Sequence, residues 1–261
     1  MCPSQAVRPP SARQLENAAR EHTTLDSRKE APQAPPKQRS HHHAATVAKE
    51  PLQAPRRQAS KTTAILDWDD TICPSTYLAS LGLRVDDAGS LPPVLRAQLA
   101  QLEDAVIEIV KEALRFGNVV IITNAEAGWV ELSGRRFLPR VVAFLIEHDI
   151  KIVSARTSFE SHYPDMPSSW KVAAFSQEVS VMFPNEDELN VLVLGDSMSE
   201  RDAAHALSTR LPNSRVKTVK FVERPSIDQL MRQVQLVAQS LPDLATYASS
   251  FDVDLVVSAS A

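Results

Sequence analysis

The chain has 261 residues, 43% of them hydrophobic, which suits one domain of ordinary size with a tail, or two small domains. No apolar run approaches the roughly 18 residues that a membrane span needs, so no membrane partner is expected. The two cysteines, Cys2 and Cys73, offer neither a disulfide framework nor a zinc spacing, which predicts a reducing, cytoplasmic environment.

Residues 1–60 have the composition of a disordered basic tail. They hold eight of the eighteen prolines and no aromatic residue, so they cannot build a core. Ten Lys and Arg against five Asp and Glu give this tail a charge of +5, and the rest of the chain carries −9. An acidic body argues against nucleic acid as a partner. The tail lacks the apolar stretch of a secretory signal, and organellar targeting stays open.

From residue 62 onward, apolar runs of strand type alternate with stretches of helical periodicity. This alternation predicts an α/β fold, a doubly wound parallel sheet with helices on both faces. We expect a catalytic domain over 61–242 and a C-terminal segment over 243–261 that holds an edge strand. The expected strands are 62–66, 118–123, 150–154, 190–195, 216–222 and 251–257; the expected helices are 91–116, 126–147 with a bend near Ser133-Gly134, 168–181 capped by Ser168 or Ser169, 200–207, and 226–239 capped by Ser226.

Polar residues of one chemical kind follow the expected strands. Asp67 and Asp69 follow the first strand, and residues two apart on an extended chain share a face. Thr123 ends the second strand, Lys171 lies early in a helix, and Asp196 follows the fourth strand. Each alone is ordinary: a cap, a solvated lysine, a turn. The carboxyl ends of parallel strands lie along one rim of the sheet, so we expect these polar side chains to meet at that rim.

Together these side chains are the parts that phosphoryl transfer needs. A phosphate dianion repels an attacking carboxylate, so a cation such as Mg²⁺ held by carboxylates must neutralise both. A hydroxyl and a lysine then hold the phosphoryl oxygens. One carboxylate attacks, and a second protonates the leaving oxygen and later activates water.

At these residues the chain resembles the haloacid dehalogenase-like (HAD) hydrolase superfamily. Asp67-Trp68-Asp69-Asp70-Thr71 is similar to its DxDx(T/V) signature, Thr123-Asn124 to its second motif, Lys171 to its third and Gly195-Asp196-Ser197 to its fourth. The resemblance covers about residues 62–222, and the first and fourth motifs are the specific ones.

The resemblance implies a role for each motif residue. Asp67 would be the nucleophile that forms an aspartyl-phosphate, and Asp69 the general acid and base. Mg²⁺ would lie between Asp67, the backbone carbonyl of Asp69, and Asp196. Glu200 stands where the family usually has a second acid and would support the metal through water, with Asp202 as the alternative. The substrate phosphate would be bound by Thr123, Asn124 and Lys171.

These implications predict a Mg²⁺-dependent phosphatase that hydrolyses phosphate monoesters. The segments after the first motif and around 159–167 are too short for a separate cap domain. An open site favours a phosphoprotein or another macromolecular substrate, or a partner subunit that completes the pocket. The sequence makes no prediction of the oligomeric state.

Two other functions remain open at this stage. A signalling receiver module shares the fold, but its phosphorylated aspartate follows the third strand, where this chain has Ser154. A catalytically weak scaffold or regulatory protein that acts through its tail is the second alternative. Turnover of an aryl phosphate would separate a phosphatase from a scaffold.

Overall fold

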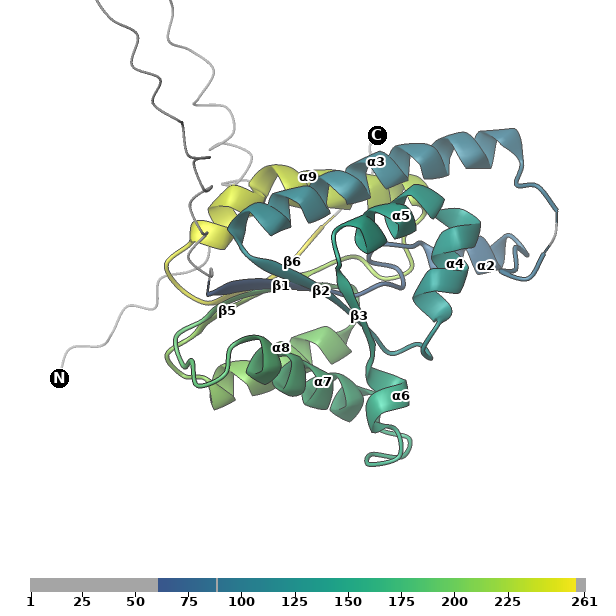
Figure 1. Ribbon diagram of the computed structural model, residues 1–261. Helices are drawn as coiled ribbons and strands as arrows, with labels where there is room; N and C mark the ends of the chain where they lie inside the picture. The colour runs from purple at the N-terminus through teal and green to yellow at the C-terminus, as the bar shows by residue number, and fades with distance from the viewer. Residues whose placement is uncertain (1–60, 88, 257–261) are drawn as a thin grey trace, which may run out of the picture. The chain divides into compact units, whose positions relative to one another are not determined.

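A computed structural model describes residues 61–87 and 89–256 (Figure 1). The expected tail over 1–60 and the end of the expected last strand, residue 257, lie outside the described residues. Strands and helices alternate along the described chain: β1 (Thr62–Leu66), α2 (Ser75–Ser80), α3 (Pro93–Phe116), β2 (Asn118–Thr123), α4 (Trp129–Phe137), α5 (Pro139–Glu147), β3 (Lys151–Ser154), α6 (Ala155–Phe159), α7 (Pro167–Met182), β4 (Asn190–Gly195), α8 (Met198–Arg210), β5 (Arg215–Lys220), α9 (Ile227–Thr246) and β6 (Phe251–Asp254).

The strands form one six-stranded, all-parallel sheet in the order β3-β2-β1-β4-β5-β6. β1 lies at its centre, where Ala64 pairs with Val119 of β2 and with Leu192 of β4. The chain winds outward in one direction from β1 to β3 and in the other from β4 to β6. The strand order therefore reverses between β1 and β4, and the carboxyl ends of these two strands flank the crevice in which such sheets bind ligands.

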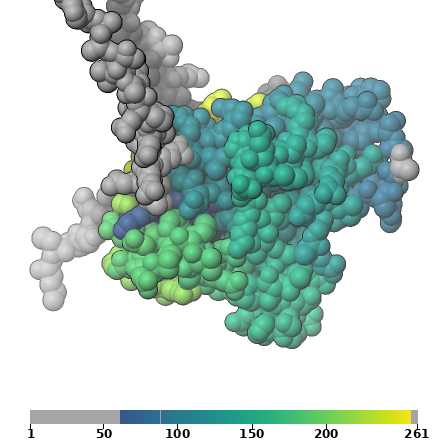
Figure 2. Space-filling model, viewed as in Figure 1, coloured from purple at the N-terminus to yellow at the C-terminus, as the bar shows by residue number. Residues whose placement is uncertain are grey.

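Alternate strand residues build two cores, one on each face of the sheet. Ala64 and Leu66 of β1 pack into the core that α3, α4, α5 and α9 cover, and Ile65 packs into the core under α7 and α8. Figure 1 shows α3 and α9 on one side of the strands and α7 and α8 on the other, and little of the sheet is visible in the space-filling view of Figure 2. Burial on both faces explains the almost continuous apolar runs of the central strands. The predicted doubly wound fold is confirmed.

The helical region expected over 126–147 is two helices. α4 ends at Phe137, Leu138 caps it, and α5 starts at Pro139, which occupies the first helical position. Proline cannot continue the preceding helix but suits the start of a new one. The bend predicted near Ser133-Gly134 is therefore wrong. Gly134 lies inside α4, where Val142 and Trp68 pack closely against it: a Cβ atom there would lie 2.3 Å from Val142 Cγ2 and 3.2 Å from the indole ring.

The N-terminal cap was predicted correctly for α9 and wrongly for α7. The Ser226 hydroxyl accepts a hydrogen bond from the third residue of α9, in a complete capping box. In α7 the N-cap is Met166 and Pro167 opens the helix, so Ser168 and Ser169 lie inside the first turn. The fixed φ of proline determines this start more strongly than a serine hydroxyl does.

The C-terminal part of the chain joins the same sheet. α9 continues across residue 242, where the expected catalytic domain ends, and β6 pairs in parallel with β5. The predicted edge strand is confirmed, with described bounds of Phe251–Asp254. Arg201 of α8 pairs with Asp252 and Asp254 and fastens β6 to its neighbouring helix. No described helix has the length and hydropathy required to cross a membrane.

Candidate active site

Asp67 lies at the reversal point of the sheet. Its backbone N–H donates to the Leu194 carbonyl at 2.9 Å, so the β1–β4 pairing continues one residue beyond β1. The next residue, Trp68, is fully buried among the α3 and α4 side chains, and its Nε1–H donates to Ser133 Oγ at 2.9 Å. Alternation along the extended chain then turns the Asp67 side chain toward the opposite face, where α7 and α8 pack.

Three carboxylates meet at this point and form what we call the acidic cluster: Asp67, Asp196 and Glu200. One oxygen from each lies within 4.8 Å of the other two. Lys171 Nζ lies 2.7 Å from Asp67 Oδ1 and forms a close ion pair with Glu200 Oε1. The structure thus brings together four of the predicted residues and selects Glu200 over Asp202, which is exposed.

The start of α8 explains how Glu200 reaches the acidic cluster. Glu200 is the third residue of α8, and its Oε2 accepts from the backbone N–H of Ser197 at 2.9 Å and from the Ser197 hydroxyl at 2.6 Å. Gly195 leaves the space for this side chain, since a Cβ atom there would lie 2.2 Å from Glu200 Cγ. Both oxygens of Glu200 therefore have protein partners: Oε2 is held by Ser197, and Oε1 holds Lys171 beside Asp67.

Burial and like charge alter the proton affinities of the acidic cluster. Burial raises the pKa of Asp67, the Lys171 charge opposes this shift and the Glu200 charge adds to it, and the net pKa is about 8. Burial and the Glu200 charge raise the pKa of Asp196 to about 7. Burial lowers the pKa of Lys171, but the charges of Asp67 and Glu200 outweigh it and the net shift is upward. When all three carboxylates are ionised, the one lysine balances only one of them, and the cluster then carries an excess of negative charge.

The donor set fits a hard divalent cation. Every group in the acidic cluster is a carboxylate, and Mg²⁺ and Ca²⁺ prefer oxygen ligands. Asp67 Oδ1 is buried and, apart from its ion pair, has no hydrogen-bond donor. Asp67 and Asp196 are the direct ligands that this arrangement offers, because the oxygens of Glu200 are engaged. A bound cation would offset the negative charge that raises both pKa values.

Asp69 is held apart from the acidic cluster. Its Oδ1 accepts from the Ser75 hydroxyl at 2.7 Å and from the Trp129 indole N–H at 2.9 Å. Its Oδ2 faces the Thr123 hydroxyl at 3.4 Å. Ser75 opens α2 and Trp129 opens α4, so two helix starts orient this carboxylate. Neither residue was predicted as part of the site, because a lone serine or tryptophan at a helix start has no signature.

Thr123 and Asn124 lie at the same rim, after β2. The buried Thr123 hydroxyl accepts from the Ala125 N–H at 3.0 Å, which fixes it beside Asp69. Asn124 Nδ2 donates to the Pro167 carbonyl at 3.3 Å and ties this loop to the first turn of α7. Its Oδ1 is buried without a partner. The two predicted phosphate-binding residues are thus close to Asp69 and to the helix that carries Lys171.

The turn after Asp69 is tightly closed. It also buries the Cys73 thiol, which is thereby excluded as an alternative nucleophile. Asp70 has a left-handed φ of 55°, and its carboxylate accepts from the Thr76 backbone N–H at 3.0 Å. Cys73 is fully buried, and burial raises the pKa of its thiol well above the usual value. The thiol therefore stays protonated and serves packing.

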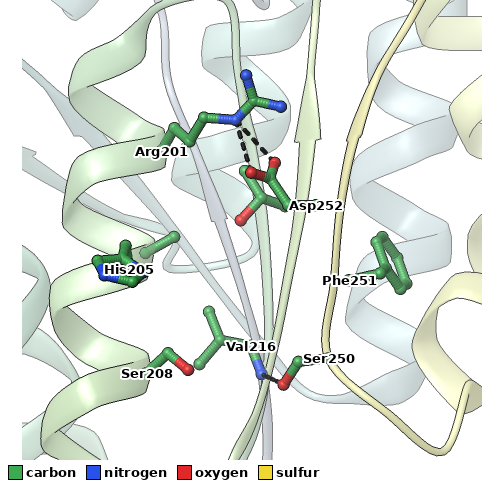
Figure 3. A pocket seen from close by; sticks show the side chains of 9 residues that line it. Arg201, His205, Ser208, Val216, Ser250, Phe251 and Asp252 are labelled. Carbon is green, nitrogen blue, oxygen red and sulfur yellow. Dashed lines mark hydrogen bonds and ion pairs between the residues drawn. The ribbon is translucent and has the colours of Figure 1, made fainter. Parts of the chain in front are cut away.

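A cavity of about 280 Å³ lies elsewhere, between α8 and the β5–β6 edge of the sheet (Figure 3). His205 and Ser208 line it from α8, and Asp252 lines it from β6. Arg201 lies at its end and is paired with Asp252 at 2.7 Å. None of its lining residues belongs to the acidic cluster, so we do not assign this cavity to the active site.

Comparison of the chain with protein-family models, with curated proteins and with solved structures found no match.

Proposed function

We propose that this chain is a Mg²⁺-dependent phosphatase of the HAD hydrolase type that hydrolyses phosphate monoesters through an aspartyl-phosphate. One observation carries the proposal. A buried carboxylate, Asp67, lies against a buried lysine and two further acids at the reversal point of a parallel sheet. A second carboxylate, Asp69, is held separately two residues later. This arrangement separates a nucleophile from a proton donor.

In the first step an oxygen of Asp67 attacks phosphorus, and the bond from phosphorus to the leaving oxygen breaks. Asp69, in its protonated form, gives its proton to that oxygen, so an alcohol leaves. Thr123 and Lys171 would donate to phosphoryl oxygens; in support, Thr123 faces Asp69 and Lys171 faces Asp67.

In the second step the aspartyl-phosphate on Asp67 is hydrolysed. Asp69, now a carboxylate, takes a proton from water, and the resulting hydroxide attacks phosphorus. The bond between phosphorus and the Asp67 oxygen breaks, phosphate is released, and both side chains return to their starting forms. Asp69 is partly exposed, so water reaches it.

Asp67 and Asp196 would hold Mg²⁺, with Glu200 as support. When bound, the cation supplies the positive charge that lets a phosphate dianion approach these carboxylates. Lys171 supplies a second positive charge from the protein. Because Glu200 keeps this lysine in place, we assign Glu200 as a positioning residue.

The open rim supports a substrate larger than a small metabolite, such as a phosphoprotein. Between β1 and α3 the described chain forms α2 and connecting turns, and between β3 and α7 it forms α6 and a loop. Neither segment builds a separate domain over Asp67 and Asp69. Contacts away from the phosphate would then have to come from a bulky substrate.

Hydrolysis of 4-nitrophenyl phosphate by the full chain tests the proposal. We expect turnover that needs Mg²⁺, stops with EDTA and falls to background in Asp67→Asn, because an amide does not attack phosphorus. Asp69→Asn should lose about 10²–10⁴-fold in rate. The matched control is Asp202→Asn, which alters an exposed acid on α8 and should retain the full rate. Substantial activity in a folded Asp67→Asn protein would refute the assignment.

A further inference from the structure

A cavity of about 400 Å³ opens beside Asp69, between α2, the segment that follows it, and α4. Its volume lies in the usual range for small-molecule sites and is far too small for a folded domain. Most of its walls are apolar or aromatic: Leu78, Leu83, Val85, Trp129, Leu132 and Phe137.

The cavity adjoins the candidate active site, because two of its lining side chains contact Asp69. Ser75 and Trp129 line the cavity, and both donate to the same oxygen of Asp69. In the proposed reaction the leaving oxygen must lie at Asp69 to receive its proton. The group carried by that oxygen therefore lies one side chain away from this cavity.

The walls show which chemistry the cavity accepts. Leu132 is 50% exposed at its edge, and a bound apolar group would cover it. Arg84 is the one cation among the lining residues, and Asp86 neutralises it through two hydrogen bonds of 2.9 and 3.1 Å. Asp87, which accepts from the Arg84 backbone N–H, adds negative charge beside this arginine. The lining of the cavity thus offers no unpaired positive charge to a second phosphate or a carboxylate and favours an uncharged group.

We propose that this cavity binds the aromatic leaving group of an aryl phosphate, with its ring against Trp129 and Leu132. The inference rests on the proposed phosphatase function and adds the class of substrate. A ring is flat, rigid and apolar, so it gains contact with tryptophan and leucine walls at a small cost in conformational entropy. Free aryl phosphates and phosphotyrosine share this chemistry.

Binding measurements with phosphonates, which cannot be hydrolysed, test the cavity independently of how reactive the ester is. Calorimetric titration of the full-length protein with Mg²⁺ compares methylphosphonate and benzylphosphonate, which have the same charged head group and cannot be hydrolysed. We expect benzylphosphonate to bind at least about tenfold more tightly, because its ring leaves water. Equal affinities would overturn the proposal.

Two variants with different physical effects locate the ring. Ala79→Trp fills the cavity from an exposed position on α2, and Leu132→Glu places a charge at its edge. Each should bring the affinity ratio of the two phosphonates close to one. Ile146→Glu is the matched control, since Ile146 is 64% exposed on α5 and lines none of these walls. A ratio unchanged in both cavity variants would place the ring elsewhere and refute the proposal.

The turnover assay distinguishes the two failures. Turnover that depends on Asp67, together with equal phosphonate affinities, would refute the cavity assignment and leave the phosphatase standing. Benzyl selectivity without such turnover would refute the phosphatase and, with it, the assignment of the cavity to a leaving group.

The source of the ring is then tested with the inactive Asp67→Asn protein. Its dissociation constants for a phosphotyrosine peptide, the same peptide with phosphoserine, and 2-naphthyl phosphate are compared. Tightest binding of the phosphotyrosine peptide indicates a protein substrate, and tightest binding of 2-naphthyl phosphate a small one. Tightest binding of the phosphoserine peptide would contradict an aromatic leaving group.

Discussion

The metal-free protein should lose stability as the pH rises from about 5.5 to about 8. The folded state holds Asp67 with a pKa of about 8, whereas an unfolded aspartate has its ordinary value of 3.8. Between these values the folded chain binds a proton that the unfolded chain has released. The contribution of Asp67 to the free energy of unfolding is therefore constant below pH 3.8 and falls as the pH rises toward 8.

The size of this loss of stability follows from the pH range between the unfolded and the folded pKa of each group. Each pH unit inside that range lowers the free energy of unfolding by about 1.4 kcal/mol per group. Asp196, with a pKa of about 7, contributes over part of the same range. Asp67 alone titrates over most of the window from about pH 5.5 to about 8, so we expect a total loss on the order of 3 kcal/mol for this interacting group. With a urea dependence of about 2 kcal/mol per molar, the midpoint should fall by about 1.5 M.

Urea unfolding in EDTA at the two pH values measures this loss. Asp67→Asn should flatten the pH dependence, because its amide carries no proton that titrates, and Asp202→Asn should leave it as in the wild type. Adding Mg²⁺ at pH 8 should raise the midpoint, since a ligand that binds only the folded state stabilises it. A wild-type protein as stable at pH 8 as at 5.5, or an Asp67→Asn protein with an unchanged slope, would refute the account of the acidic cluster.

Three further substitutions test single contacts by urea or thermal unfolding. Lys171→Met should cost about 3–5 kcal/mol without metal, because buried carboxylates lose their cation. Gly195→Ala should cost about 1–3 kcal/mol and raise the Mg²⁺ concentration needed for activity, because its Cβ displaces Glu200. Lys217→Met should cost about 1–3 kcal/mol, because the buried ammonium donates to two carbonyls at the end of α9. Unchanged unfolding midpoints would contradict each assignment.

The central strands were predictable because the sheet is buried on both faces. Such strands read as short apolar runs, and the runs at 62–66, 118–123 and 190–195 match β1, β2 and β4. The helix break at Pro139 and the start of α7 at Pro167 were missed. In both cases a proline fixed the backbone, although weaker serine and glycine signals stood nearby.

The acids of the candidate site were also predictable, because parallel strands place their carboxyl ends at one rim. Asp67, Lys171, Asp196 and Glu200 meet as expected. The sequence did not show that both Glu200 oxygens are occupied, since this depends on the space left by Gly195.

The surroundings of Asp69 could not be predicted. Ser75 and Trp129 are distant from each other in sequence and meet only because α2 and α4 start at the same rim. The cavity beside them depends on that tertiary arrangement, so no local pattern in the chain could have indicated it.

Trapping the covalent enzyme tests the central claim most directly. The full-length protein is mixed with an aryl phosphate and Mg²⁺, quenched in acid and reduced with borohydride, which converts an aspartyl-phosphate to homoserine. Mass spectrometry of the peptide that carries residues 62–71 then locates the reduced position. We predict homoserine at residue 67, dependent on Mg²⁺ and absent in Asp67→Asn. Steady turnover with an unmodified Asp67, or modification at Asp69 or Asp196 instead, would contradict the account.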